Sequence, residues 1–248
     1  MSTEKKNTPL KIRKIDAKGK PVILVGDVHG CFDEYNKLLT TARSRYGKDA
    51  TLVSLGDIVD RGPGVHDALR MSEEEGVLMV MGNHEEKLIR YKAGRDVKIR
   101  KSQQVSIDCM TDEDYKYITT SDHYIEIPEY NLKAVHGGFF PDSATETQPM
   151  KCIIRLRYII PGTHKIFRPG EQPEKAVFWG DVFPGPEHAI FGHDHAVEIR
   201  EFDYATGIDT GCVFGGKLTA LAYLPDKKIE TIQVKAKKSY WREADSYE

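Results

Sequence analysis

The chain contains little that would place it in or on a membrane. Its apolar runs fall far short of a membrane span, and its first twenty residues are charged, without the apolar segment of a secretory signal. Ser2 stands where the usual myristoylation signal requires glycine, which excludes that anchor. We therefore expect a soluble, cytoplasmic protein that does not act at membranes.

An excess of charge of one sign is also missing. Lys and Arg number 36 and Asp and Glu number 38, which gives a formal net charge of -2. Without an overall positive field, the composition gives no indication of DNA binding. Any polyanionic ligand must therefore be bound by local groups of Lys and Arg side chains.

Cysteine is scarce, and the four copies form no CxxC pair. This spacing favours reduced thiols of an intracellular protein over a disulfide framework or a thiolate metal site. Linker-like tracts of Pro, Gly or Ser are absent as well. We therefore expect one domain over residues 21–235, preceded by a flexible segment at 1–20 and followed by a polar, frayed tail at 236–248.

What the sequence does contain is a set of five apolar runs that each end in polar residues beside a glycine. They read VILVGD, TLVSLGD, VLMVMGN, LKAVHG and HAIFGH, and they begin at residues 22, 51, 77, 132 and 188. Runs of this kind predict buried strands. Because ligands of open α/β sheets bind beyond the carboxyl ends of the strands, the polar residues are expected to share one site.

The residue types at these five ends are those that hold hard or borderline divalent ions. Such ions favour mixed oxygen and nitrogen ligands when a position must stay open for water. The two carboxylate oxygens of Asp57 can bridge two ions. On one ion we expect Asp27 and His29, and on the other Asn83, His136 and His193. Taken singly, each residue would more often be a turn or cap residue, but five repeats of one design disfavour that interpretation.

Between the strands, helical spacing is predicted for three segments. The first begins at an N-cap, Asp33, and stops at Gly47; the second covers residues 63–76; the third follows a cap at Thr111. Alternating strands and helices predict a parallel sheet with right-handed crossovers. After residue 199 short alternating segments predict antiparallel strands, with a hairpin turning at residues 225–228.

Three of the motifs, GDVHG, GDIVDRG and GNHE, resemble the signatures of the phosphoprotein phosphatase family within the calcineurin-like metallophosphoesterases. The resemblance implies an α/β fold with a central β-sandwich flanked by helices and a two-metal site on the loops at the C-terminal ends of strands. It also implies roles for residues at matching positions. The metal ligands would be Asp27, His29, Asp57, Asn83, His136 and His193.

The same resemblance implies the catalytic groups. Arg61 would clamp a phosphate, His84 would protonate the leaving group, and Asp60 would orient His84. A second candidate clamp is Arg157, in the segment IRLRY. The two ions would be Mn²⁺, with Fe, Zn, Co or Mg as alternatives.

A narrower resemblance, to symmetrical diadenosine tetraphosphatases and their ApaH-like relatives, lies in GIDTGCVFGGKLTAL at 207–221 and in IRLRY. Glu85 departs from the Asp that the bacterial enzymes usually have. The predicted reaction splits diadenosine tetraphosphate, a dinucleoside polyphosphate, into two ADP. Alternatives are ApaH-like action on polyphosphate or RNA caps, a protein Ser/Thr phosphatase, and a phosphoprotein-binding module without activity. The sequence leaves the oligomeric state open.

Substrate choice is expected to depend on the segment 92–124, between GNHE and the fourth run. Two groups of cations in or near the site are candidates for holding distal phosphates, although a solvated surface is the alternative. They are Arg95, Lys98, Arg100 and Lys101 in the first group, and Lys151, Arg155, Lys165 and Arg168 in the second.

Overall fold

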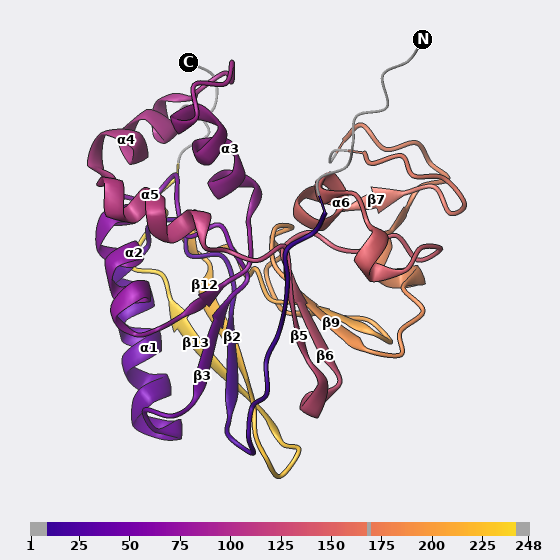
Figure 1. The fold of residues 1–248 in the computed structure, drawn as a ribbon, viewed down its shortest axis with the longest axis horizontal. Coiled ribbons are helices and arrows are strands. Elements are labelled where there is room, and N and C mark those ends of the chain that lie inside the picture. The colour runs from indigo at the N-terminus through magenta and orange to yellow at the C-terminus, as the bar shows by residue number, and fades with distance from the viewer. Residues whose placement is uncertain (1–8, 168–169, 242–248) are drawn as a thin grey trace.

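The computed structural model describes residues 9–167 and 170–241. Within them, two β-sheets pack face to face, and helices cover the outer faces of the pair (Figure 1). This is the predicted α/β sandwich. Arg168, predicted as a phosphate contact, lies outside the described residues.

The first sheet has five strands in the order β13-β12-β2-β3-β4. Its parallel part consists of β2 (Val22–Val25), β3 (Thr51–Ser54) and β4 (Leu78–Met79), as the alternation of strands and helices predicted. Its antiparallel part is the hairpin of β12 (Lys217–Tyr223) and β13 (Ile229–Lys235), which turns where it was predicted to turn.

The second sheet has six strands in the order β1-β5-β6-β9-β11-β10. Two of them carry predicted site residues at their ends: β6 (Leu132–Val135) and β9 (His188–Phe191), which are parallel. The remaining strands are β1 (Ile12–Lys14), β5 (Tyr124–Ile127), β10 (Arg200–Glu201) and β11 (Ala205–Gly207). A separate small hairpin joins β7 (Tyr158–Ile159) and β8 (Val177–Phe178).

Six α-helices are assigned in the described residues. The outer face of the five-stranded sheet packs against α1 (Phe32–Tyr46), α2 (Val65–Glu74) and α5 (Asp112–Thr119). The others are α3 (Asn83–Lys92), α4 (Lys101–Cys109) and α6 (Met150–Arg155). Thr111 caps α5 as predicted, because its hydroxyl accepts from the backbone N–H of Asp114. The cap predicted for α1 is wrong: Cys31 is the N-cap and Asp33 lies in the first turn.

Alternation along β2 explains the layers of the core. Val22 and Leu24 face the other sheet, where they pack with Ile125 and Ile190, whereas Ile23 and Val25 face the helices. Complete burial of such side chains contributes roughly 1.5–3 kcal/mol each. If the pairing register of β2 shifted by one residue, its side chains would exchange the two faces. The apolar run therefore fixes the register of β2, and with it the position of Asp27 beyond the end of the strand.

Both ends of the described chain are more ordered than the sequence suggested. Part of the N-terminal segment expected to be flexible forms β1, which pairs in parallel with β5. Residues 236–241, expected to fray, pack against α1 and the segment 212–216. Among the described helices, none is long and apolar enough to cross a membrane.

Candidate metal centre

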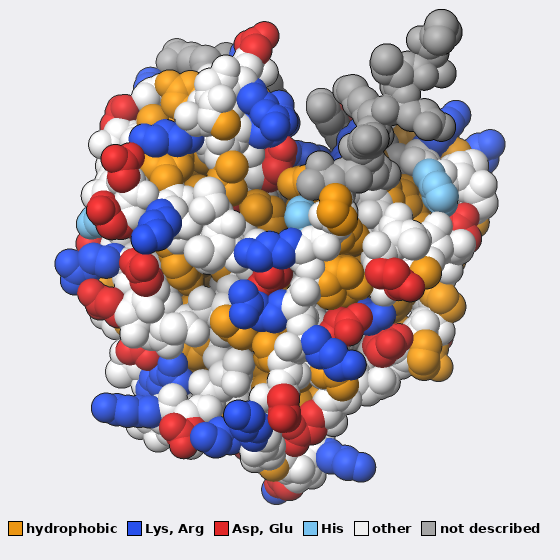
Figure 2. All heavy atoms as spheres, in the orientation of Figure 1, with side chains coloured by type: hydrophobic (Ala, Val, Ile, Leu, Met, Phe, Trp, Pro, Cys, Tyr) orange, Lys and Arg blue, Asp and Glu red, His pale blue; other side chains and the backbone are white. Residues whose placement is uncertain are grey.

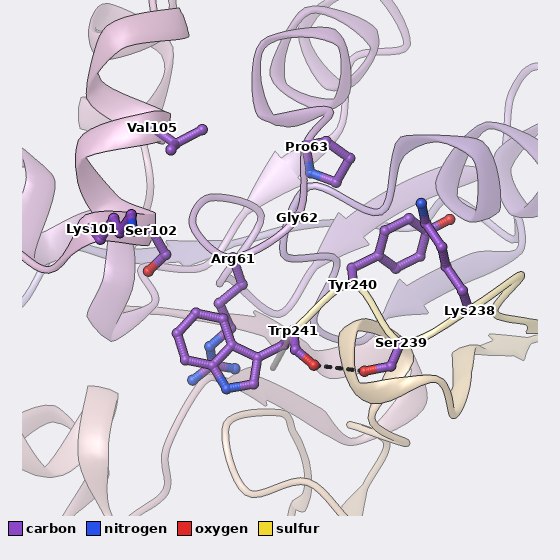
Figure 3. Close-up of a pocket in the computed structure, with 10 residues that line it drawn as sticks. All are labelled: Arg61, Gly62, Pro63, Lys101, Ser102, Val105, Lys238, Ser239, Tyr240 and Trp241. Carbon is purple, nitrogen blue, oxygen red and sulfur yellow. Dashed lines mark hydrogen bonds between the residues drawn. The ribbon is translucent and has the colours of Figure 1, made fainter. Parts of the chain in front are cut away.

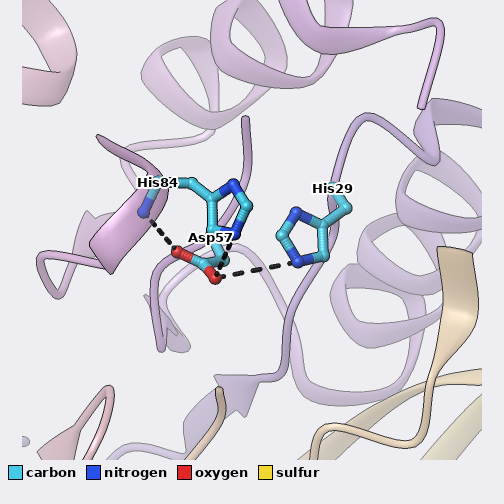
Figure 4. Close-up of side chains that lie close together, drawn as sticks. All are labelled: His29, Asp57 and His84. Atoms are coloured by element: carbon cyan, nitrogen blue, oxygen red, sulfur yellow. Dashed lines mark hydrogen bonds and ion pairs between the residues drawn. The ribbon is translucent and has the colours of Figure 1, made fainter. Parts of the chain in front are cut away.

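The carboxylate of Asp57 lies at the point where the ends of both sheets meet. Its Oδ2 atom is 3.3 Å from His136 Nε2, 3.7 Å from His29 Nε2 and 3.8 Å from His84 Nε2. The other oxygen, Oδ1, accepts from the backbone N–H of His84 at 3.0 Å (Figure 4). Residues that are 107 positions apart in the chain are thus gathered around one carboxylate, as predicted from the strand ends.

Two of these imidazoles are held in the tautomer that a metal ligand needs. His29 Nδ1 donates to the carbonyl oxygen of Val59 at 2.9 Å, and His136 Nδ1 donates to that of Leu55 at 2.7 Å. Since a carbonyl can only accept, each ring carries a proton on Nδ1, and Nε2 faces Asp57 with a lone pair available to a metal ion whenever the ring is neutral.

The remaining predicted ligands border the same space. Asp27 accepts from the backbone N–H of His193 through both oxygens at 3.1 Å, and its Oδ2 lies 3.9 Å from His29 Nε2. Asn83 Oδ1 lies 3.2 Å from His136 Nε2. The six side chains that were predicted as ligands therefore converge on one region.

The donor set fits divalent cations. Ligand atoms of two trios, His29 with Asp57 and His84, and Asp57 with His136 and His193, lie within 4.8 Å of one another. His193 Nε2 is a buried nitrogen with no hydrogen-bond partner. Electron pairs on Asp57, Asn83 and His136 also face one another, an arrangement that a cation between them would stabilise.

Burial and local charge set the protonation of the centre. Burial lowers the pKa of His29 and of His193, so both rings are neutral near pH 7. Burial acts to raise the pKa of Asp57, but His136 and His84 outweigh it and hold that pKa well below its usual value. His136 in turn has a raised pKa, because the Asp57 charge outweighs the effect of burial. Asp57 therefore stays ionised, and its negative charge favours a cation bound beside it.

Backbone strain is concentrated at this site. Of the eight described residues other than glycine that have a positive φ angle, five lie at this site: His29 (47°), Asp57 (51°), His193 (68°), Asp60 and Arg61. The left-handed region costs such residues free energy, on the order of 1–3 kcal/mol each. The tight turns that these angles create bring the side chains back over the strand ends.

Glu85 has a specific role in holding the Asp57 loop. Its carboxylate, completely buried, accepts from the backbone N–H groups of Asp57, Ile58 and Val59 at 2.9, 2.7 and 3.1 Å. Burial, followed by the charge of Asp57, raises the pKa of Glu85 to about 7. These contacts, which join α3 to the turn after β3, were not predicted from the sequence.

The predicted catalytic groups adjoin the carboxylate cluster. His84 Nδ1 donates to Asp60 Oδ2 at 2.6 Å, so Asp60 fixes the ring and leaves Nε2 facing the centre. Arg61 reaches over the same space, with Nη1 2.7 Å from His29 Nε2 and Nη2 3.4 Å from His84 Nε2. A metal ion on His29 Nε2 and the hydrogen bond from Arg61 exclude each other, because both use one lone pair.

Arg157 is engaged by the protein itself. Its Nε donates to Asp194 Oδ1 at 2.7 Å and its Nη2 to the carbonyl oxygen of His193 at 2.8 Å. Arg200 donates to the other oxygen of Asp194 at 2.8 Å. Arg157 thus holds the loop of His193 in place, in addition to lining the cleft beside the centre.

This cleft has a volume of about 780 Å³ and opens from the centre toward α6. Cations dominate its lining: Arg61, Arg100, Lys151, Arg155 and Arg157. Figure 2 shows the molecule hollowed on the face between α3 and the α6 region, with basic side chains at the rim. Arg155 also pairs with Glu86 at 2.8 Å. Several of the cations predicted to hold phosphates therefore line one cavity that reaches His84 and His193.

Two residues near the site were not identified as site residues from the sequence. Asp209, in the DTGC stretch, is buried close enough to Asp27 that its charge helps to raise the pKa of Asp27, after burial itself. Trp241 lies with its ring centroid 5.7 Å from the guanidinium carbon of Arg61. The indole of Trp179, by contrast, is completely buried in the core.

Comparisons with known proteins agree with this geometry. A model of the family described as calcineurin-like phosphoesterase matches residues 20–197. Proteins named asymmetrical bis(5'-nucleosyl)-tetraphosphatase PrpE are similar to this chain. That of Bacillus mycoides is 29% identical over 85% of this chain and 92% of its own length. That of Bacillus subtilis is 27% identical over 88% of this chain and 95% of its own length.

Solved structures are similar too. The crystal structure of a protein assigned as a diadenosine tetraphosphatase superposes with a TM-score of 0.75 and 26% identity, over 90% of this chain and 98% of that one. A protein serine/threonine phosphatase from Saccharomyces cerevisiae shares the fold alone, with a TM-score of 0.53, 13% identity, and coverage of 92% and 84%.

Proposed function

The chain belongs to the calcineurin-like phosphoesterase family, and on that basis we propose that it hydrolyses a phosphoanhydride bond of dinucleoside tetraphosphates. The observation that carries the proposal is the position of the Asp57 carboxylate among three imidazole nitrogens, at the mouth of a cleft lined by cations. The similarity to tetraphosphatases over most of the chain supports the choice of substrate.

Two divalent ions would be held by Asp27, His29, Asp57, Asn83, His136 and His193, with Asp57 shared between them. When bound, such a pair supplies Lewis-acid activation of water and of the phosphoryl group. We keep Mn²⁺ as the first ion to test, because the donors are mixed oxygen and nitrogen ligands.

The protein groups around the ions would bind and protonate the substrate. The guanidinium of Arg61 matches two phosphoryl oxygens, and the cleft cations hold the rest of the phosphate chain. His84 donates a proton from Nε2 to the departing oxygen while Asp60 keeps the ring in place through Nδ1. The oxygen of a water molecule forms a new bond to phosphorus, the bridging P–O bond breaks, and one proton of the water is released to solvent. The two products leave as separate nucleotides.

For the position of cleavage we propose the asymmetrical mode, which yields AMP and ATP from diadenosine tetraphosphate. The relatives that match most of the chain are named for this mode. The symmetrical mode predicted from the DTGC stretch is not confirmed. It stays as the competing outcome, and two molecules of ADP would be its products.

A second substrate class is favoured by a specific observation, the row of cations in the cleft. These cations would also suit inorganic polyphosphate or the phosphate bridge of an RNA cap. Inorganic polyphosphate carries no nucleoside, and an RNA cap carries RNA on one side of its phosphate bridge, so either differs from a free dinucleotide.

The test is turnover of diadenosine tetraphosphate with Mn²⁺ and separation of the products by ion-exchange chromatography. We expect AMP and ATP in equal amounts. Two ADP would refute the asymmetrical mode and retain the tetraphosphatase assignment. Turnover of a phosphopeptide without any turnover of the dinucleotide, polyphosphate or capped RNA would refute the assignment itself. The Asp57→Asn protein serves as the control for contaminating hydrolases.

A further inference from the structure

A second cavity shares Arg61 with the basic cleft. It has a volume of about 390 Å³ and lies between the first turn of α4 and residues 236–241, which we call the C-terminal strap (Figure 3). Its walls include Trp241, Tyr240, Pro63 and Val105, the hydroxyls of Ser102 and Ser239, and three cations, Arg61, Lys101 and Lys238. Flat aromatic and apolar walls with a few hydroxyls are typical of sites for small planar ligands.

The strap is held in place by bonds to distant parts of the chain. Glu34, on α1, accepts from the backbone N–H of Lys237 at 2.8 Å and from the hydroxyl of Tyr240 at 2.9 Å. The carbonyl oxygen of Val213 accepts from the backbone N–H groups of Tyr240 and Trp241 at 2.9 and 3.1 Å. These contacts fix the strap at Lys237 and at its two aromatic residues, so the wall of the cavity is built by the fold.

Arg61 connects this cavity to the centre. Its guanidinium carbon lies 5.7 Å from the ring centroid of Trp241 and 5.2 Å from that of Phe214, while Nη1 contacts His29. A ligand with a phosphate on Arg61 would therefore have the partly buried indole of Trp241 next to it. A nucleotide combines these two features, a charged phosphate and a flat base a short distance away.

From this geometry we propose that the cavity beside the C-terminal strap binds a nucleobase of the substrate, with the base stacked on Trp241. The proposal rests on the proposed function and extends it, because it locates the nucleoside next to the phosphate that Arg61 holds. The remainder of the phosphate chain then lies in the basic cleft, which Arg61 also lines. Stacking on an aromatic ring tolerates any base, so recognition extends to dinucleotides with other bases.

Binding can be tested without turnover. Of the two tryptophans in the chain, Trp179 is completely buried and Trp241 is only partly buried. Titration with AMP should quench the fluorescence of Trp241, whereas ribose 5-phosphate, which lacks the base, should not. Equal quenching by both ligands, or no quenching by AMP, would overturn the proposal.

Kinetics provide the second arm. In Trp241→Ala the KM for diadenosine tetraphosphate should rise about tenfold or more, and Trp241→Phe should restore most of the loss. The inhibition constant of inorganic tripolyphosphate, which has no base, should change much less. A rise of both constants by one factor would mean that Trp241 only positions Arg61, and would overturn the proposal.

A matched control is Tyr204→Ala, which removes an exposed aromatic ring remote from both cavities. If Trp241→Ala does not fold, the fluorescence titration of the unaltered protein still tests whether the base binds at Trp241. The two proposals fail separately: quenching by AMP in a protein that hydrolyses no dinucleotide would support the base cavity and refute the substrate assignment.

Discussion

Glu85 Oε2 accepts a hydrogen bond of 2.9 Å from the backbone N–H of Asp57, the residue whose side chain lies among the imidazoles. The same carboxylate also binds the next two backbone N–H groups. The residue after GNH in the third motif therefore fixes the backbone of the second motif. An aspartate would have to reach the same three donors with a side chain one methylene shorter.

Glu85→Asp should consequently loosen the Asp57 loop. We expect metal affinity to fall about 10- to 100-fold, the usual cost of changing an outer-shell partner. Isothermal titration with Mn²⁺ measures this. Glu73→Asp, an exposed change on α2, is the control. An unaltered metal affinity in Glu85→Asp would contradict the role.

Asp57→Asn should remove the shared carboxylate. One amide cannot supply two anionic oxygens, so both ions should bind more weakly and turnover should be lost. Metal content by atomic emission and product release are the two measurements. Full turnover with two ions bound would be incompatible with a bridging Asp57.

His84→Asn should separate protonation from metal binding. Metal content should remain close to that of the unaltered protein, while kcat falls about 10²- to 10⁴-fold, most for substrates with poor leaving groups. Asp60→Asn should lower kcat in the same direction, because the Nδ1 bond of His84 is weakened. An equal loss of kcat across a series of leaving groups would argue against proton donation.

Arg157→Ala distinguishes two roles. If Arg157 mainly holds the His193 loop through Asp194, metal affinity should fall about 10- to 100-fold and kcat with it. If it mainly clamps phosphate, KM should rise and metal affinity should not change. We expect the first result, and Asp194→Asn should reproduce it. Lys151→Ala, in the same cleft, is the control that should affect KM alone.

Gly192→Ala should damage the centre without touching a predicted ligand. A Cβ atom at this position would overlap Asp27 Oδ1, so the carboxylate or the β9 end must move. We expect a loss of stability of about 1–3 kcal/mol and weaker metal binding. Thermal denaturation and Mn²⁺ titration measure the two effects. A variant as stable and as tight in metal binding as the unaltered protein would show that the contact is absent.

The strand ends could be predicted because each is encoded locally, by an apolar run with a glycine and a polar residue behind it. The runs that end at Asp27, Asp57 and Asn83 form neighbouring strands, and those that end at His136 and His193 form the facing pair. Convergence of the side chains follows from that topology. The roles of these residues in metal binding remain predictions.

Other features could not be read from the chain because they depend on contacts between distant residues. The bond between Glu34 and the backbone of Lys237 spans 203 positions, and it turns an apparently polar tail into a wall beside Arg61. Cys31 replaces Asp33 as the cap of α1 because the turn after His29 starts the helix earlier than its polar residue suggests. Local helix or strand propensity carries no information on the contact between Glu34 and Lys237.

The left-handed backbone angles at His29, Asp57, Asp60, Arg61 and His193 have a consequence for evolution in the laboratory. Glycine adopts these angles at little cost, so substitutions to glycine there would relieve part of the cost while removing the chemistry. Selection for heat resistance alone should therefore favour stable but inactive variants, and only a screen that also requires turnover would retain these five residues.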